Sequence, residues 1–403
     1  MNKKIMAVGS LTNEAIGTDR SHLPHWICRT TPAEALKIAA ELGLLEKNPF
    51  DPAVDMDRIA ILKNKLGAYL QLPTLDRQRP LEDGPEVLAF GTQTKQLPRR
   101  LSYLEPFAEG SQGEMLRVSQ QETCKRSWEP SIPEMLIQID LQRAGLHVPP
   151  ISFVGVLRET ESTKGIALAF MDLVPGKDVF EVIQSAKGLL PATINPFVAI
   201  LLTDMVPILQ HLHARGVLYR DIKPENILCE KGEKIRFFGI DFGVATCKGE
   251  QAEALGTLEY MAPEVLGRLL KDKGLEPSGP DFKLLASFRK SDPKVAEPSD
   301  VYALGLALCY VINSTPRQYQ KYDLSTESKI NSSIKNAYLV AIKGSYKEPK
   351  PWSSLDTLIA SMIDPDPAKR PTLQQILTHP FMRENPVNDT LRKSTLRNIA
   401  TYF

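Results

Sequence analysis

Residues 219–226 and 241–243 contain the side chains of this chain that are best suited to catalysis. The first run reads Tyr-Arg-Asp-Ile-Lys-Pro-Glu-Asn and the second reads Asp-Phe-Gly. Transfer of a phosphoryl group requires a carboxylate for the proton of the attacking hydroxyl, a cation near the phosphate, and oxygen ligands for a metal. Asp221 and Lys223 provide the first two, and the side chains of Asn226 and Asp241 provide hard oxygen atoms for Mg²⁺. The two runs therefore predict metal-assisted phosphoryl transfer.

These two runs resemble the catalytic loop, H-R-D-x-K-x-x-N, and the metal loop, D-F-G, of the eukaryotic-type serine/threonine protein kinase family. Tyr219 stands where His is usual, as in the cyclic-nucleotide-dependent branch that the run also resembles. The resemblance implies that Asp221, Lys223, Asn226 and Asp241 are catalytic, with Asn226 and Asp241 as metal ligands. It also implies ATP and Mg²⁺ as cofactors.

Three later segments extend the resemblance over roughly residues 165–382. The run Gly256–Glu264 resembles the end of a kinase activation segment, and Asp300 resembles the buried residue that anchors the catalytic loop. Arg370 resembles the late arginine of the family, which we expect to pair with Glu264. A buried pair of this kind fixes a loop, because loss of either partner leaves the other's charge uncompensated.

The same segments indicate the class of substrate. Thr257 together with Lys223 follows the serine/threonine rather than the tyrosine pattern of the family. Kinases of small molecules generally lack the Ala-Pro-Glu run found here at residues 262–264. The resemblance therefore implies phosphorylation of serine or threonine in a protein substrate, and it disfavours a small-molecule kinase.

The resemblance implies an α+β, two-lobed protein-kinase-like fold with a small β-rich lobe and a large helical lobe. We assign residues 81–174 to the small lobe and 175–385 to the large lobe, followed by a C-terminal tail at 386–403. Residues of about 267–298 are rich in charge, Pro and Ser, which predicts an exposed insertion. Two amphipathic patterns in residues 1–80 predict an N-terminal helical extension, which supports the kinase core or recruits a protein partner.

The small lobe is expected to contain five strands and one helix, at about residues 133–146. By resemblance to the segment that joins the lobes, Met171 guards the nucleotide pocket. The backbone of Asp172 and Val174 then contacts adenine, and Asp178 contacts the ribose. Capping of the next helix is an alternative role for Asp178.

Two registers are possible for the phosphate-binding part of the small lobe, and Glu134 is the helix glutamate in both. In the first, Gly110–Gly113 is the phosphate hairpin and Lys125 is the strand lysine. In the second, the hairpin contains Gly91, and Arg117 replaces the lysine. We prefer the second, because in the first the gaps from Gly113 to Lys125 and from Lys125 to Glu134 are too short for two strands and a connection. Cofactor-binding residues are then Gly91 and Arg117 together with Glu134 and the residues of the linker.

The preferred register leaves a second function open. Arginine is not a conservative replacement for lysine at a crowded phosphate, and a hairpin with one glycine holds its amides farther from the phosphates. Lys95 could reach the phosphate instead, as in the with-no-lysine kinases that it resembles here, although a surface role is the alternative. A pseudokinase that scaffolds or activates a partner is therefore the alternative to an active enzyme.

Composition limits the location and partners of the chain. Its net charge of +1, with 49 basic and 48 acidic residues, does not suggest nucleic acid or a membrane surface as a partner. Its five cysteines are widely spaced, which favours reduced thiols and a cytoplasmic location. We find no apolar run that approaches the length of a membrane span, and so we expect no membrane span.

Glu253 generates a prediction about activation. It stands three residues before Gly256, where many kinases carry a phosphorylated threonine, and its carboxylate could pair with Arg220 without phosphorylation. Dephosphorylated protein should therefore be active at once. Glu253→Ala should lower the rate without abolishing it, because an accessible pair contributes only about 0–1 kcal/mol. Rate measurements on protein from a host without activating kinases test this, and protein that is inert until Thr246 or Thr257 is phosphorylated contradicts it.

Overall fold

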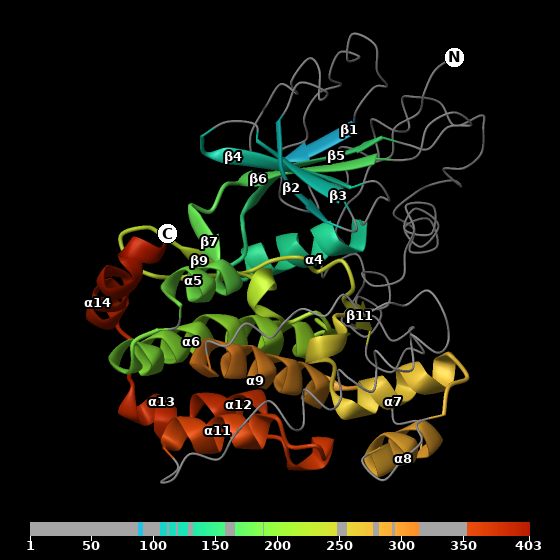
Figure 1. Ribbon diagram of the computed structural model, residues 1–403. Helices are drawn as coiled ribbons and strands as arrows, with labels where there is room; N and C mark the ends of the chain where they lie inside the picture. Colours follow the sequence, from blue (N-terminus) through green and yellow to red (C-terminus); the bar gives the residue numbers. More distant parts are fainter. Residues whose placement is uncertain are drawn as a thin grey trace, which may run out of the picture. The chain divides into compact units, whose positions relative to one another are not determined.

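The computed structural model describes the chain in two compact units, Met1–Val174 and Pro175–Phe403 (Figure 1). The division falls inside the segment that resembles the kinase linker. The N-terminal extension expected at residues 1–80 lies outside the described residues, as do Lys95 and Glu253. The structure describes residues 88–91, 105–110, 113–117, 120–127, 132–157, 166–187, 189–247, 256–276, 282–291, 295–313 and 353–403.

The first unit is built on a single antiparallel sheet of six strands in the order β1-β5-β6-β4-β3-β2 (Figure 1). The prediction was five strands, one fewer than the sheet contains, and β1 lies at its edge beside β5. The sheet confirms a small β-rich unit before the helical one. Its strands are β1 (Leu88–Gly91), β2 (Glu105–Gly110), β3 (Gly113–Arg117), β4 (Glu122–Ser127), β5 (Ile151–Leu157) and β6 (Ile166–Asp172).

Among the described residues of the small unit, helix α4 (Ile132–Arg143) follows β4. Its side chains Ile137 and Leu141 are buried, which anchors the helix by removing apolar surface from water. The turn that follows the helix contains Gly145, whose φ of 72° is accessible to glycine at little cost. The N–H of Leu146 then bonds to the carbonyl of Leu141 at 3.1 Å and closes the last turn.

The second unit is mostly helical, and α6 and α9 form the centre of its core (Figure 1). Residues such as Leu202 and Met205 on α6 and Leu304 and Leu308 on α9 have no exposed surface. The helices are α5 (Val179–Ala186), α6 (Pro191–Ala214), α7 (Pro263–Asp272), α8 (Lys283–Ser291), α9 (Glu297–Asn313), α11 (Ser354–Met362), α12 (Leu373–Leu377), α13 (Pro380–Glu384) and α14 (Asp389–Ile399).

Two small sheets of the second unit hold the loops that carry the catalytic motifs. One has the order β10-β9-β7, and the other pairs β11 with β8. The catalytic loop runs from β8 to β9, and the metal loop runs from β10 to β11. Both loops are thus held at their two ends by strand pairing. The strands are β7 (Gly176–Asp178), β8 (Val217–Leu218), β9 (Ile227–Glu230), β10 (Phe237–Gly239) and β11 (Thr246–Cys247).

Helix α6 contradicts the expectation that no apolar run approaches the length of a membrane span. Residues Ala192–Ala214 have a mean hydropathy of 1.7 and are long and apolar enough to cross a membrane by length and composition alone. However, 67% of this stretch is buried inside the structure. Its apolar side chains are accounted for by the protein core, and α6 is the central core helix of the second unit.

The insertion expected to be exposed, at about 267–298, is partly packed. Its described residues contain most of α7 and all of α8. Leu285 of α8 is fully buried, and a Cβ placed on Gly267 of α7 would lie 2.6 Å from the Cβ of Phe288. Glycine at residue 267 therefore permits the close approach of the two helices. The charged residues that suggested exposure lie on the other faces of these helices or outside the described residues.

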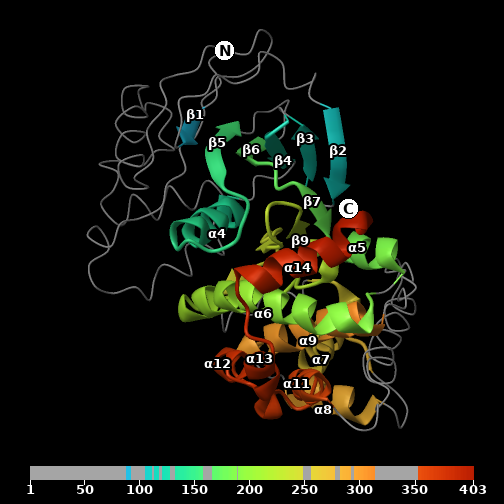
Figure 2. The same ribbon diagram turned by 90° about the vertical axis from the view of Figure 1, so that its left-hand side faces the viewer.

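The segment expected to be a tail, 386–403, instead forms α14 and packs along α6 (Figure 2). Arg392 of α14 is buried, and its guanidinium nitrogens bond to both carboxylate oxygens of Asp204 on α6 at 2.6 and 2.9 Å. Asp204 also accepts from the N–H of Phe237 on β10 at 2.9 Å. One buried carboxylate thus joins α6, β10 and α14, which makes α14 part of the core.

We predict that Arg392→Met strongly destabilises the second unit, because it removes the guanidinium partner of the buried Asp204 carboxylate. Breaking a buried ion pair costs about 3–5 kcal/mol. For a unit of this size the melting temperature should fall by on the order of 10 °C. Thermal unfolding followed by calorimetry measures this shift.

Asp389→Asn is the matched control, because Asp389 lies on the same helix and pairs with Lys234 at the surface. Its melting temperature should equal that of the wild type. If Arg392→Met melts like this control, α14 is not held by the Asp204 pair.

Candidate active site

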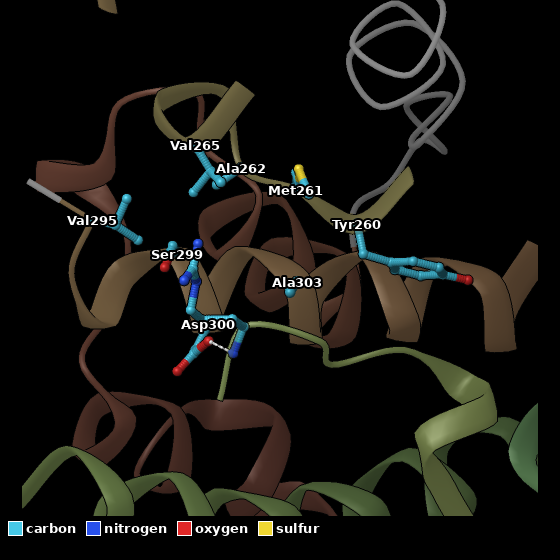
Figure 3. A pocket seen from close by; sticks show the side chains of 9 residues that line it. Tyr260, Met261, Ala262, Val265, Val295, Ser299, Asp300 and Ala303 are labelled. Atoms are coloured by element: carbon cyan, nitrogen blue, oxygen red, sulfur yellow. Dashed lines mark hydrogen bonds between the residues drawn. The ribbon is translucent and has the colours of Figure 1, made fainter. Parts of the chain in front are cut away.

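Asp300 on α9 is completely buried and holds the start of the catalytic loop. Its Oδ2 accepts from the N–H of Tyr219 at 2.9 Å. Its Oδ1 accepts from the N–H of Arg220 at 2.8 Å, and Figure 3 shows Asp300 at the start of α9. Nε2 of His213 lies 2.8 Å from Oδ2. A buried carboxylate is tolerated only when such partners compensate its desolvation. The anchoring role expected of Asp300 is therefore confirmed, while His213 had no signal in the sequence because it lies outside the motif.

Tyr219 joins the catalytic loop to the metal loop. Its ring stacks on Phe242 with the ring centroids 4.7 Å apart, and its hydroxyl donates to the carbonyl of Ile240. Burial raises the pKa of the Tyr219 hydroxyl well above its ordinary value, so that the hydroxyl stays protonated and remains a donor. Tyrosine in place of the usual histidine thus keeps both a ring and a donor at this position.

The backbone is unusual at two residues of these loops. Arg220 has a φ of 70° and Asp241 a φ of 61°, in the left-handed region that residues other than glycine seldom adopt. Such conformations persist where surrounding bonds determine them, as Asp300 does for Arg220, and they cluster at functional sites. Both outliers lie within the two motifs that the sequence singled out.

Asp221 is the centre of a closed hydrogen-bond network. Its Oδ1 accepts from the hydroxyl of Thr257 at 2.6 Å, and its Oδ2 lies 2.9 Å from Nζ of Lys223. Lys223 also donates to the Thr257 hydroxyl at 2.8 Å. Nδ2 of Asn226 bonds to Oδ2 of Asp221 at 2.9 Å. A carboxylate, an ammonium group, an amide and a hydroxyl thus meet, as the catalytic loop motif predicts.

Gly256 allows Thr257 to reach this network. Its φ is 122°, and a Cβ at this position would lie 2.6 Å from the carbonyl oxygen of Arg220. Any other residue would therefore force the activation segment away from the catalytic loop. The close approach of the two segments explains why Gly precedes Thr here.

Asn226 and Asp241 form a donor set that suits Mg²⁺. The side-chain nitrogen of Asn226 donates to Asp221, so that the side-chain oxygen points away from Asp221. The backbone carbonyl of Asn226 accepts from the N–H of Ile240 at 3.1 Å. The residue before Asp241 is thereby held against Asn226. In the described part of the chain no group of three or more His, Cys, Asp or Glu could hold a metal. Mg²⁺ commonly uses one or two protein oxygens and completes its shell with phosphates and water.

The expected pair of Glu264 and Arg370 is confirmed. The two guanidinium nitrogens of Arg370 bond to the two carboxylate oxygens of Glu264 at 2.6 and 2.8 Å, and both side chains are buried. Arg370 also donates to the carbonyls of Asp364 and Pro298, at 2.8 and 2.9 Å, and lies over the ring of Tyr302. The pair thus ties the end of the activation segment to three other segments of the second unit.

A small hollow lies between the end of the activation segment and the start of α9 (Figure 3). Its lining includes Val265 of α7 and Ala262, the residue before this helix. Ser299 of α9 and Val295, two residues before α9, also line it. Its volume of about 10 Å³ is enough for about one water molecule. It therefore fits no substrate in this form.

The small unit places Lys125, and not Arg117, beside Glu134. Nζ of Lys125 on β4 bonds to Oε1 of Glu134 on α4, and the two side chains are 17% and 4% exposed. Arg117 is exposed at the end of β3. Gly91 lies in β1, which pairs with β5 at the far edge of the sheet from β2 and β3. The structure thus contradicts the preferred register and has the pairing of the alternative one.

The preferred register was wrong because it overestimated the number of residues needed between Gly113 and Lys125. It assumed that two complete strands were needed between Gly113 and Lys125. The structure needs only β3, a short connection, and the first half of β4, with Lys125 opposite Met115. Between Lys125 and Glu134 the chain completes β4 and enters α4 after a connection of residues 128–131. Antiparallel neighbours require only such tight turns.

The linker residues are placed as follows. Met171 is buried, whereas Asp172 is exposed at the end of β6. The Asp172 N–H bonds to the Pro150 carbonyl at 3.0 Å, so that Asp172 can contact adenine only through its carbonyl oxygen. Val174 is half-buried, and its contact with adenine stays a prediction.

Asp178 caps α5, the alternative role considered for it. Its Oδ1 accepts from the N–H of Glu181 at 2.7 Å. Burial raises its pKa to about 6, and the nearby carboxylates of Glu181 and Glu225 act in the same direction. The cap does not exclude a ribose contact through the second carboxylate oxygen, which stays a prediction.

Comparison with known proteins gives the same assignment. The family model described as Protein kinase domain matches residues 144–382. Calcium-dependent protein kinase 20 of Oryza sativa subsp. japonica is 27% identical over 256 residues, 62% of this chain and 40% of that protein. Sperm motility kinase 1 of Mus musculus is 28% identical over 236 residues, 57% of this chain and 40% of that protein. The chain spans less than half the length of these relatives.

The Glu264 pair generates a stability prediction. Glu264→Ala leaves the Arg370 guanidinium buried without its carboxylate and should lower the free energy of unfolding by about 3–5 kcal/mol. Denaturant titration followed by circular dichroism measures the change. Arg268→Ala is the control on the same helix, because its pair with Asp272 is more accessible and contributes about 0–1 kcal/mol. Equal stabilities of the two variants would show that the buried pair does not stabilise the unit.

Proposed function

Because the chain belongs to the protein kinase domain family, we propose that it transfers the terminal phosphoryl group of ATP to serine or threonine residues of proteins. The observation that carries this proposal is the network at Asp221. Its Oδ1 already accepts a hydrogen bond from an alcohol, the Thr257 hydroxyl, at 2.6 Å. A serine or threonine of a substrate presents the same chemical group to the same carboxylate.

In the proposed reaction, Asp221 orients the substrate hydroxyl and takes up its proton. The Asn226 amide fixes the rotation of the carboxylate through Oδ2. Lys223, already 2.9 Å from Asp221, offsets the negative charge that develops on the transferred phosphoryl group. Thr257 holds the end of the activation segment against the catalytic loop, so that the acceptor site and the proton acceptor stay in register.

Asn226 and Asp241 would hold Mg²⁺, which neutralises charge on the phosphates of ATP when bound. On the small unit, Lys125 would contact the phosphates and Glu134 would orient Lys125, because the two already form an ion pair. Met171 would border the adenine site, with backbone groups of Asp172 and Val174 as its polar contacts.

Two features support a protein substrate with serine or threonine as the acceptor. Lys223 and Thr257 are in direct contact, in accord with the serine/threonine pattern expected from the sequence. The Ala262-Pro263-Glu264 run is built into the core through Arg370. Recruitment of a protein partner by residues 1–80 remains part of the proposal.

The pseudokinase alternative loses its main argument. It was based on Arg117 as the replacement for the strand lysine, whereas the lysine that pairs with Glu134 is Lys125. The glycine pair of residues 110 and 113 also lies at the β2–β3 turn, where the first register expects the phosphate hairpin. We therefore favour the active enzyme.

We predict that Asp221→Asn lowers kcat by about 10²- to 10⁴-fold, the contribution of a positioned proton acceptor. Since Asn226 and Asp241 remain, Mg²⁺ with ATP should still raise its melting temperature as in the wild type. Asp241→Ala should lose both transfer and the part of the thermal shift that depends on Mg²⁺. Radiolabelled phosphate transfer and a thermal-shift assay measure the two effects. Wild-type turnover in Asp221→Asn would rule out the assigned role.

A further inference from the structure

Two glutamines on helix α4 attach this helix to the backbone just before and at the start of β5. Nε2 of Gln138 donates to the carbonyl of Pro149 at 2.7 Å, and Oε1 of Gln142 accepts from the N–H of Ile151 at 2.9 Å. Residues four apart on a helix lie on one face. Both side chains therefore reach the same short segment, one as a donor and the other as an acceptor.

Gln138 is a polar residue in the interior of the small unit. It is only 5% exposed, and a buried amide is stable there only if it is hydrogen-bonded. The bond to Pro149 meets this requirement, and Nε2 also lies 3.8 Å from the sulfur of Met171. An apolar side chain would fill the space but would not fix the direction of the helix, whereas a hydrogen bond has a defined length and angle.

The segment that receives these bonds, Pro149–Ile151, is itself hydrogen-bonded to the end of β6. The carbonyl of Pro150 accepts from the N–H of Asp172 at 3.0 Å, at the end of β6. Helix α4 is therefore connected through Pro149 and Pro150 to the residues next to Met171. These contacts all lie inside the small unit.

The same helix carries Glu134, one turn before Gln138. Glu134 bonds to Lys125 on β4. The helix is thus held at its start by an ion pair and farther along by two amide bonds. Rotation or displacement of α4 would break all three contacts together.

We propose that Gln138 and Gln142 are positioning residues that hold α4 in the orientation in which Glu134 pairs with Lys125. Their relevance to catalysis rests on the proposed kinase function, whereas the attachment itself does not.

Hydrogen–deuterium exchange of the full chain tests the attachment without any assay of activity. Gln138→Met keeps the volume of the side chain but cannot donate to Pro149, and Gln142→Leu cannot accept from Ile151. Each variant should exchange the amides of α4 about tenfold faster, the upper effect of one net hydrogen bond. Exchange of α6 should not change, because α6 belongs to the other unit. Gln142→Glu is the matched control and should exchange as the wild type, since its carboxylate can still accept.

Kinetics test the consequence for the reaction. A helix that leaves its position reversibly lowers the fraction of molecules competent to bind nucleotide, which raises KM for ATP by about twofold or more while kcat at saturating ATP is kept. A general loss of folded protein would instead lower kcat and leave KM unchanged.

Unchanged exchange of α4 in Gln138→Met and Gln142→Leu would overturn the proposal, and so would faster exchange of α4 and α6 together. The proposal is supported if α4 alone exchanges faster and KM for ATP rises while kcat is unchanged. If the wild type neither binds Mg²⁺ with ATP nor transfers phosphate, the proposed function fails, and the exchange result still decides whether the glutamines hold the helix.

Discussion

The buried carboxylate of Asp300 is the interaction on which the arrangement of the catalytic loop depends. It is removed from water and must be satisfied by protein donors, and the donors are the N–H groups of Tyr219 and Arg220. These bonds force Arg220 into a left-handed conformation, after which the chain turns and places Asp221 between Lys223 and Asn226. The position of the reactive carboxylate is therefore set by a residue far away in sequence that takes no part in the proposed chemistry.

The large unit could be predicted well because its important contacts join motifs whose residue types are restricted. Asp300, Glu264 and Arg370 were each expected to be buried and paired, and the structure pairs them as expected. His213 could not be predicted, because a single histidine on a long helix gives no indication of its partner. Its contact with Asp300 arises only from the packing of α6 against α9.

The small unit was harder to predict because its key contact depends on strand register. Lys125 and Glu134 are separated by a turn whose length does not reveal whether β4 ends early or late. A shift of one residue would move every side chain of a strand to the other face of the sheet. Composition misled at residues 267–298, where the charged residues concealed the burial of Leu285.

The position of α14 has a consequence for the biosynthesis of the protein. The residues that match the kinase family end at residue 382, yet the Asp204 carboxylate in the middle of α6 finds its guanidinium partner only at Arg392. During synthesis α6 is complete long before α14 emerges. A nascent chain at that stage exposes apolar surface of α6 that is later buried, and exposed apolar surface promotes aggregation or chaperone binding. The core of the second unit can therefore close only after translation has passed the family boundary.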